Sequence, residues 1–181
     1  MNQKAISTTR NICLSGLFLA LCFVLPIFTG SIPAIGSMLS PMHIPVFLCG
    51  IICGWQYGFA VGAIAPILRH LTMGGMPPIH TALGMTFELA TYGLVVGLSF
   101  KLLPKKDFYI WVSLVIAMLV GRGVWGLAAW LIYPLITGKA FTLTTFLTGA
   151  FITAWPGIII HLMLVPAIIL VLRRAKIMKS E

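Results

Sequence analysis

Residues 108–136 read FYIWVSLVIAMLVGRGVWGLAAWLIYPLI, an apolar run interrupted by one charged side chain, Arg122. A helix needs about 20 apolar residues to cross the hydrocarbon core of a bilayer, so this run is long enough to span one. In a spanning helix every backbone polar group is satisfied within the helix, as lipid requires. The run therefore indicates a transmembrane helix.

The rest of the chain has the same character. Of its 181 residues, 60% are apolar and only 8% are charged. A soluble domain of this size cannot bury so large an apolar fraction, because its surface stays large relative to its volume. The sequence therefore predicts an all-α integral membrane protein, with residues 1–181 forming a single transmembrane domain and membrane lipid covering its exterior.

We expect a compact bundle of six transmembrane helices, and the segment at 12–28 reads as a retained helix rather than a signal peptide. The six helices are expected at about 12–28, 42–53, 56–71, 79–100, 108–136 and 143–172. The pair at 42–53 and 56–71 is short for a core of about 30 Å, so one long helix and five spans are the alternative. Six spans are favoured because they place both termini and the basic turn between residues 101 and 107 together on the cytoplasmic side.

The net charge of +9 comes mostly from Lys and Arg at the two termini and in this turn. Clusters next to membrane helices orient a protein and meet anionic lipid headgroups. This distribution argues against nucleic acid as a partner.

Small residues recur at four-residue intervals, which allows helices to approach closely in a membrane. Glycines occupy every fourth position from Gly50 to Gly62, and these are expected to pack the bundle. Gly16 and Ala20 on the first helix have the same spacing. That pair fits either internal packing or a partner in the membrane.

Two formal charges, Glu88 and Arg122, fall deep within predicted spans. Each costs at least about 2.5 kcal/mol to insert, so such residues normally face other helices and have a partner. Both lie about 18–21 Å from the cytoplasmic ends of their helices at 1.5 Å per residue. The common depth is consistent with a mutual ion pair, and equally with the binding of a polar solute by one or both.

Aromatic and polar side chains share helix faces with these two charges. Tyr92 lies one turn from Glu88, while Trp125 and Tyr133 follow Arg122. An arginine with aromatic walls suits a small anionic or aromatic metabolite. His43, Arg69 and His80 stand at outer helix ends, where Arg69 fits either an entrance for an anion or an interfacial position next to lipid headgroups. The candidate substrate-binding residues are His43, Arg69, His80, Glu88, Tyr92, Arg122, Trp125, Tyr133 and Trp155.

No motif for hydrolysis, group transfer or nucleotide phosphate binding occurs in the sequence. We therefore expect no enzymatic activity and no cofactor. The histidines do not follow a metal-ligand spacing, so no metal site is expected. Three interpretations of the function remain. The chain is a solute-binding subunit, a self-sufficient proton-coupled permease or channel that uses Glu88 and Arg122, or a structural or assembly protein.

Several stretches together resemble a known family. They are SPMHIPV at 40–46, CG at 49–50, GW at 54–55, PILR at 66–69, GMPP at 75–78 and FELATYG at 87–93. With the six-span layout and the small-residue first helix, they resemble the substrate-binding S components of energy-coupling factor (ECF) transporters, which import vitamins in prokaryotes. The likeness covers nearly the whole chain and is to the pantothenate-type branch.

The resemblance implies a multi-pass protein of the prokaryotic plasma membrane that binds a vitamin with high affinity, most simply pantothenate or a related B vitamin. It also implies a transmembrane coupling protein (T component) and two cytoplasmic ATPases as partners. Gly16 and Ala20 match the positions that dock on the coupling protein, although the family motif usually has alanine where Gly16 stands. Arg122 or Arg69 would meet the carboxylate of pantothenate.

Overall fold

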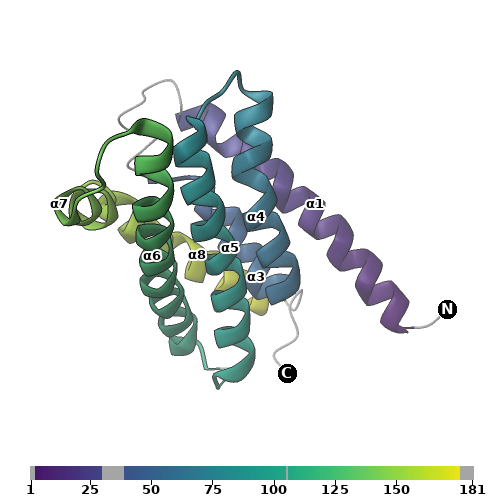
Figure 1. Ribbon diagram of the computed structural model, residues 1–181. Helices are drawn as coiled ribbons and strands as arrows, with labels where there is room; N and C mark the ends of the chain where they lie inside the picture. The colour runs from purple at the N-terminus through teal and green to yellow at the C-terminus, as the bar shows by residue number, and fades with distance from the viewer. Residues whose placement is uncertain (1–2, 30–38, 105, 176–181) are drawn as a thin grey trace.

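The computed structural model describes residues 3–29, 39–104 and 106–175, and in these ranges every regular element is a helix (Figure 1). Lys105, Lys176 and Lys179, which belong to the predicted basic clusters, lie outside the described residues. The elements in chain order are α1 (Gln3–Thr29), α3 (His43–Ile52), α4 (Trp55–Thr72), α5 (Ile79–Leu102), α6 (Phe108–Thr137), α7 (Leu143–Leu147), the π-helix η1 (Thr148–Ile152) and α8 (Trp155–Arg174).

Four helices are long and apolar enough to cross a membrane: residues Ser7–Ile27 of α1, and α5, α6 and α8. Their presence agrees with the expected all-α membrane protein. By the same measure α3 and the segment Leu143–Ile152 are shorter apolar helices. The six-span count and the cytoplasmic placement of both termini therefore remain predictions.

Helix α3 is short because it lies inside the bundle. It packs against α1, α4, α5 and α8, and every residue from His43 to Ile51 is buried. An apolar helix that is surrounded by other helices gains its stability from packing and need not reach both membrane surfaces by itself. The chain then reverses at Gly54, whose φ of 102° is a conformation that suits glycine.

Helices α3, α4 and α5 meet along a glycine interface made of Gly50, Gly58, Gly62, Gly93 and Gly97. A Cβ added to Gly50 would lie 2.6 Å from the carbonyl oxygen of Gly93, and one added to Gly97 would lie 2.6 Å from the Cα of Trp55. A Cβ on Gly62 would meet the backbone of Leu89. The backbones therefore touch directly, which is the packing role expected for Gly50, Gly58 and Gly62. The expectation is wrong for Gly54, which lies in the turn before α4 with no atom within 4 Å of an added Cβ.

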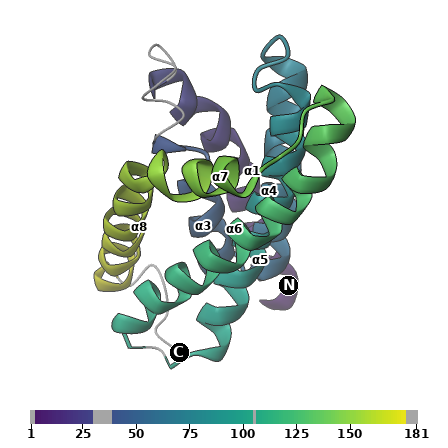
Figure 2. The same ribbon diagram turned by 60° about the vertical axis from the view of Figure 1, so that its left-hand side comes forward.

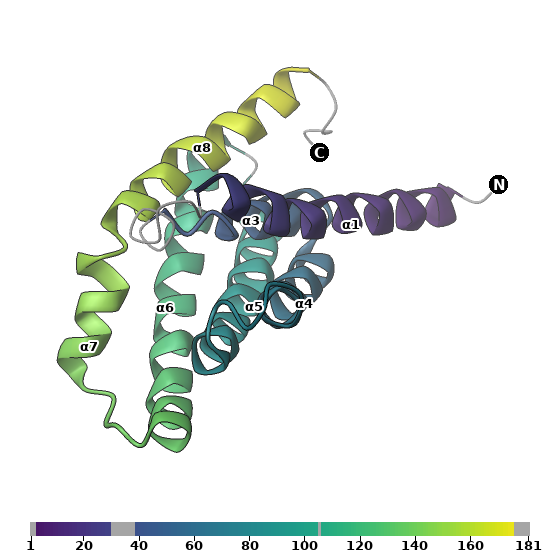
Figure 3. The ribbon, with the colours of Figure 1, turned by 90° about the horizontal axis from the view of Figure 1, so that it is seen from above.

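The segment predicted as one helix from 143 to 172 is divided into α7, η1 and α8. Pro156 is the second residue of α8, where its missing N–H is not needed by the helix, so this position favours the start of a new helix. The π-turn at Thr148–Ile152 and the residues Thr153 and Ala154 redirect the chain just before that proline. As a result α7 lies across the bundle between the end of α6 and the start of α8 (Figures 2 and 3).

Helix α1 leans outward, and its N-terminal half extends away from the other helices (Figures 1 and 3). Phe18 and Cys22 are buried against the bundle, whereas Gly16 and Ala20 are exposed. No heavy atom lies within 4 Å of a Cβ built on Gly16. This glycine is therefore not required by packing within the chain.

Candidate functional site

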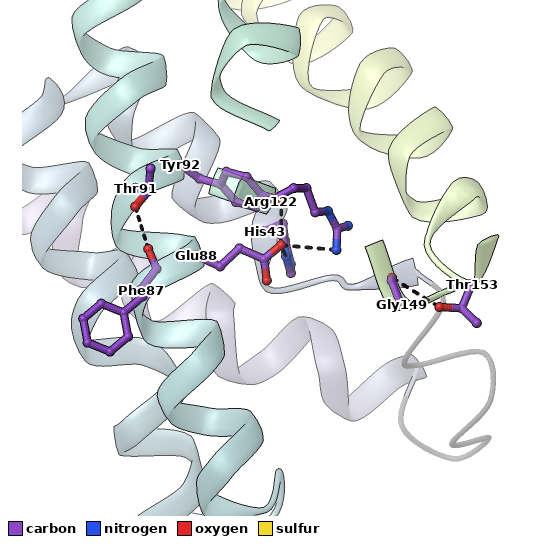
Figure 4. A network of polar contacts seen from close by, with 8 residues as sticks. All are labelled: His43, Phe87, Glu88, Thr91, Tyr92, Arg122, Gly149 and Thr153. Carbon is purple, nitrogen blue, oxygen red and sulfur yellow. Dashed lines mark hydrogen bonds and ion pairs between the residues drawn. The ribbon is translucent and has the colours of Figure 1, made fainter. Parts of the chain in front are cut away.

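The carboxylate of Glu88 is the centre of a buried polar cluster that joins three helices (Figure 4). Glu88 is 3% exposed, and its Oε1 accepts a hydrogen bond of 2.7 Å from the hydroxyl of Tyr92, one turn further along α5. The same oxygen lies 3.3 Å from Nη1 of Arg122 on α6 and 3.9 Å from Nε2 of His43 at the start of α3. The pair of Glu88 and Arg122 suggested by their common depth is thus present.

Small residues bring these side chains together. A Cβ on Gly121 would collide with the ring of Tyr92, so the glycine next to Arg122 lets α6 approach α5 at the level of the cluster. Gly84, one turn before Glu88, leaves room for the indole of Trp125, whose Nε1 would lie 3.3 Å from an added Cβ. Helices α5 and α6 are therefore in close contact at the level where Glu88 and Arg122 form their ion pair.

Behind the carboxylate, two histidine rings stack. The ring centroids of His43 and His161 are 5.4 Å apart with an interplanar angle of 16°, and His161 is 2% exposed. His43 also contacts the ring of Tyr92, with centroids 5.4 Å apart. The sequence does not single out His161, yet the structure places it in contact with the cluster.

Several buried polar atoms in this region lack a hydrogen-bond partner within the described part of the chain. They are both ring nitrogens of His43, Nε2 of His161 and Nε of Arg69. Buried polar groups are normally hydrogen-bonded, and an exception calls for a ligand, a water or a strained role. Here the unsatisfied atoms of His43 and Arg69 belong to residues that line one cavity.

This polar cavity has a volume of 380 Å³ and lies between the end of α1, the start of α3, helices α5 and α6, and η1. Glu88, Arg122 and His43 form its inner wall together with Trp125 and Thr81. Gly149, Thr153 and Ala154 contribute the wall formed by η1 and the following turn, and Figure 4 shows Arg122 extending toward that side. A cavity of this size falls within the range of small-molecule sites, roughly 300–1,000 Å³.

The outer part of the cavity is lined by Arg69 near the end of α4 and by Met76 and Pro77 of the following loop. Nη1 of Arg69 lies 3.2 Å from the sulfur of Met42, and a thioether is only a weak acceptor. His70 holds the loop, because its Nδ1 lies 2.7 Å from the carbonyl oxygen of Pro77. Arg69 therefore presents its guanidinium to the cavity without a carboxylate partner among the described residues.

The predicted site residues fall into three groups. His43, Arg69, Glu88, Arg122 and Trp125 line the cavity, and Tyr92 binds Glu88 from behind. His80 and Tyr133 contact each other, with ring centroids 5.5 Å apart, but are not cavity-lining residues.

Trp155 forms a third group by itself, since it is 58% exposed and does not line the cavity. The sequence also gives no weight to Met42, Gly149 or Thr153, which do line it. His161 could have been recognised by the rule that singled out Glu88, because it too is a polar residue inside an apolar run. The break before α8 could have indicated Gly149 and Thr153, whereas no signal in the sequence indicates Met42.

Among the described residues, no group of three or more His, Cys, Asp or Glu side chains is arranged to hold a metal ion. The residues that converge on the cavity are instead two arginines, one glutamate, one histidine and several hydroxyl and apolar groups. This set can bind a small solute through charge and hydrogen bonds. It shows no activated nucleophile.

Comparison with known proteins gives a family but no individual relative. The family model described as "ECF transporter, substrate-specific component" matches residues 10–169. No curated protein and no solved structure matches the chain. Proteins of this family are transport subunits rather than enzymes, and the family implies a small-molecule substrate, a T component and ATPases as partners. With apolar helices that can cross a membrane and a match over most of its length, this chain belongs to the family of substrate-specific components of ECF transporters.

Proposed function

We propose that this chain is the high-affinity binding subunit for a small carboxylate-bearing vitamin, with pantothenate or a close relative as the substrate. The protein would reside in a prokaryotic plasma membrane, with six spans and both termini in the cytoplasm. The single observation that carries the proposal is the excess positive charge of the polar cavity. Among the described residues that line it are two arginines, Arg69 and Arg122, but only one carboxylate, Glu88.

The two arginines have different surroundings. Arg122 lies 3.3 Å from Glu88, so the two charges neutralise each other. Arg69 has only the Met42 sulfur near Nη1, and its Nε is buried without a partner. Because an arginine binds a carboxylate through charge-assisted hydrogen bonds, Arg69 is the better candidate for the carboxylate of the substrate.

The residues of the inner wall of the cavity are suited to bind a polar, uncharged group of the substrate. Both ring nitrogens of His43 lack a hydrogen-bond partner within the described part of the chain, and the Glu88 carboxylate and the Thr81 hydroxyl line the cavity nearby. These groups accept or donate hydrogen bonds to hydroxyls and amides. Pantothenate carries a carboxylate at one end and hydroxyls at the other, with an amide between them, which matches this division of the cavity.

Trp125 and the apolar side chains Met42, Met85 and Met76 complete the walls. They would contact the hydrocarbon portion of the substrate, as is usual in small-molecule sites where a few polar groups set the orientation. Gly16 and Ala20 on the exposed face of α1 would dock on the coupling protein. The two partner ATPases would supply the energy.

A matched pair of ligands tests the substrate proposal. Pantothenol is the alcohol analogue of pantothenate and lacks only the carboxylate. We expect calorimetry on the purified protein to show that pantothenate binds more tightly than pantothenol by at least about tenfold, the value of one charge-assisted hydrogen bond. Equal affinities, or no binding of pantothenate, would contradict recognition of this carboxylate.

The role of Arg69 is tested with a matched variant. Arg69→Gln should lower pantothenate affinity about tenfold and leave pantothenol unchanged, so that the preference between the two ligands disappears. Lys139→Gln removes an exposed cation that does not line the cavity, and it should preserve the preference. If Arg69→Gln retains the full preference, another cation binds the carboxylate.

Uptake measurements separate a subunit from a self-sufficient permease that uses Glu88 and Arg122 as a proton relay. The chain is produced in a host with and without a coupling module of T component and ATPases. We expect substrate accumulation only with the module. Undiminished accumulation in its absence would favour the permease.

A further inference from the structure

Far from the polar cavity, three elements are joined by the side chain of Arg173 near the end of α8. Its Nη1 donates a hydrogen bond of 2.7 Å to Oδ1 of Asp107, just before α6. Its guanidinium also lies over the ring of Phe100 near the end of α5, 5.4 Å from the centroid. The end of α5, the start of α6 and the end of α8 are therefore in contact.

These contacts collect the basic residues that neighbour them in the sequence. Lys101 follows Phe100, Lys106 precedes Asp107, and Arg174 follows Arg173. Lys101, Lys106 and Arg174 are exposed, and none of the three has an ion-pair partner within the described ranges. Together with Arg173 they form a basic end of four cations with one carboxylate, Asp107, which is held by Arg173.

Exposed apolar side chains adjoin this basic end. Leu102 is 80% exposed and Phe108 is 69% exposed. On the next turn of α6, Trp111 donates its indole N–H to the carbonyl oxygen of Leu162 on α8, at 3.0 Å. Leu102 and Phe108 are thus exposed apolar neighbours of Lys101 and Asp107 at the α5–α6 turn.

The basic end also lies at a defined level. Lys101 is thirteen positions after Glu88 on α5, which places it about 20 Å further along the helix axis. The basic end as a whole stands where α5 and α8 end and where α6 begins, and all three helices are long enough to cross a membrane. Basic residues at such ends lie among lipid headgroups.

We propose that the basic end, formed by Lys101, Lys106, Arg173 and Arg174, is a binding site for an anionic phospholipid. The phosphate of the headgroup contacts the cations of the α5–α6 turn and of α8, and an acyl chain lies against Leu102 and Phe108. A soluble phosphate would use the cations but not the apolar side chains, which is why a lipid fits better. The bound lipid adds a second bridge beside the Arg173–Asp107 pair and holds α8 to α5 and α6.

Titration of the detergent-purified full chain with two lipids of identical acyl chains tests this site, with bound lipid counted by native mass spectrometry. We expect phosphatidylglycerol to bind at least about tenfold more tightly than phosphatidylcholine. The double variant Lys101→Gln/Lys106→Gln should lose on the order of tenfold or more in phosphatidylglycerol affinity, since each cation near an anionic surface contributes about fivefold. The charge-matched control Arg10→Gln/Lys139→Gln removes two cations elsewhere and should retain wild-type affinity.

Glycerol phosphate, the headgroup chemistry without acyl chains, serves as the competitor. It should fail to displace phosphatidylglycerol at millimolar concentration. Displacement would identify a soluble-anion site and overturn the lipid proposal. Equal affinity of the wild type for the two lipids, or equal losses in the two double variants, would overturn it as well. Unchanged thermal midpoints of the variants establish that the differences do not come from unfolding.

Discussion

The glycine interface and the polar cavity are both built on α5, and they use that helix in opposite ways. At Gly93 and Gly97 the backbone of α5 touches α3 and α4 with no space for a Cβ. At Thr81, Met85 and Glu88 the side chains of the same helix face an open volume of 380 Å³. The comparison teaches that the cavity is a local departure from close packing, held open beside a rigid helix contact.

The two regions also differ in the satisfaction of their polar groups. The glycine interface involves backbone groups that are already hydrogen-bonded within helices. At the cavity, both ring nitrogens of His43 and Nε of Arg69 are buried with no hydrogen-bond partner in the described chain. A membrane protein that needed only stability would have filled this volume with apolar side chains, since burying unsatisfied polar groups is costly. The difference therefore supports a ligand as the reason for the cavity.

The largest effect is expected from the charge at the centre of the cavity. Glu88→Gln leaves Arg122 and His43 without their buried carboxylate, and removing one member of a buried pair costs about 3–5 kcal/mol. The thermal unfolding midpoint in detergent should fall accordingly. The double variant Glu88→Gln/Arg122→Gln should recover most of that loss. A single variant as stable as the wild type would mean that the pair contributes nothing to the fold.

A smaller effect on stability is expected from glycine substitutions. Its sign should differ between a glycine inside the glycine interface and one outside it. Gly93→Ala places a methyl group against the backbone of Gly58 and should destabilise the protein by about 1–3 kcal/mol. Gly123→Ala, on the same kind of helix but with no atom within 4 Å of the new Cβ, should be neutral or stabilising by up to about 1 kcal/mol. The denaturation midpoints of the two variants can be compared directly. Equal shifts would contradict the expectation that a glycine in the interface is more sensitive to an added methyl group than Gly123.

The smallest effect on stability and on ligand affinity is expected at Gly16, which belongs to neither region. Gly16 is exposed and has no atom within 4 Å of an added Cβ. Gly16→Leu should therefore change the unfolding midpoint and the affinity for the vitamin little. The variant should nevertheless co-purify poorly with the coupling protein, because the larger side chain keeps α1 from approaching a partner helix closely. Wild-type recovery of the complex would remove Gly16 from the proposed docking surface.

Much of the fold could be predicted because lipid imposes simple rules. Long apolar runs become helices, and Gly50, Gly58 and Gly62 form a close contact, whereas Gly54 forms a turn. The division of the segment from 143 to 172 was not predicted, because its apolar pattern runs unbroken through the π-turn at Thr148–Ile152. For the site, depth along the helix brought Glu88 and Arg122 together correctly, whereas Trp155 lies on the surface and His161 lies in the cluster.

The sequence by itself determined that this chain is a helical membrane protein, which costly polar residues lie in its spans and that its family is one of transport subunits. These properties follow from composition, spacing and local motifs, which do not depend on how distant segments meet. Only the tertiary structure decided that Arg122 is already paired with Glu88 while Arg69 is not, and that His43 stacks on His161. It also decided that η1 forms one wall of the cavity, because pairing and exposure depend on the directions in which separate helices cross.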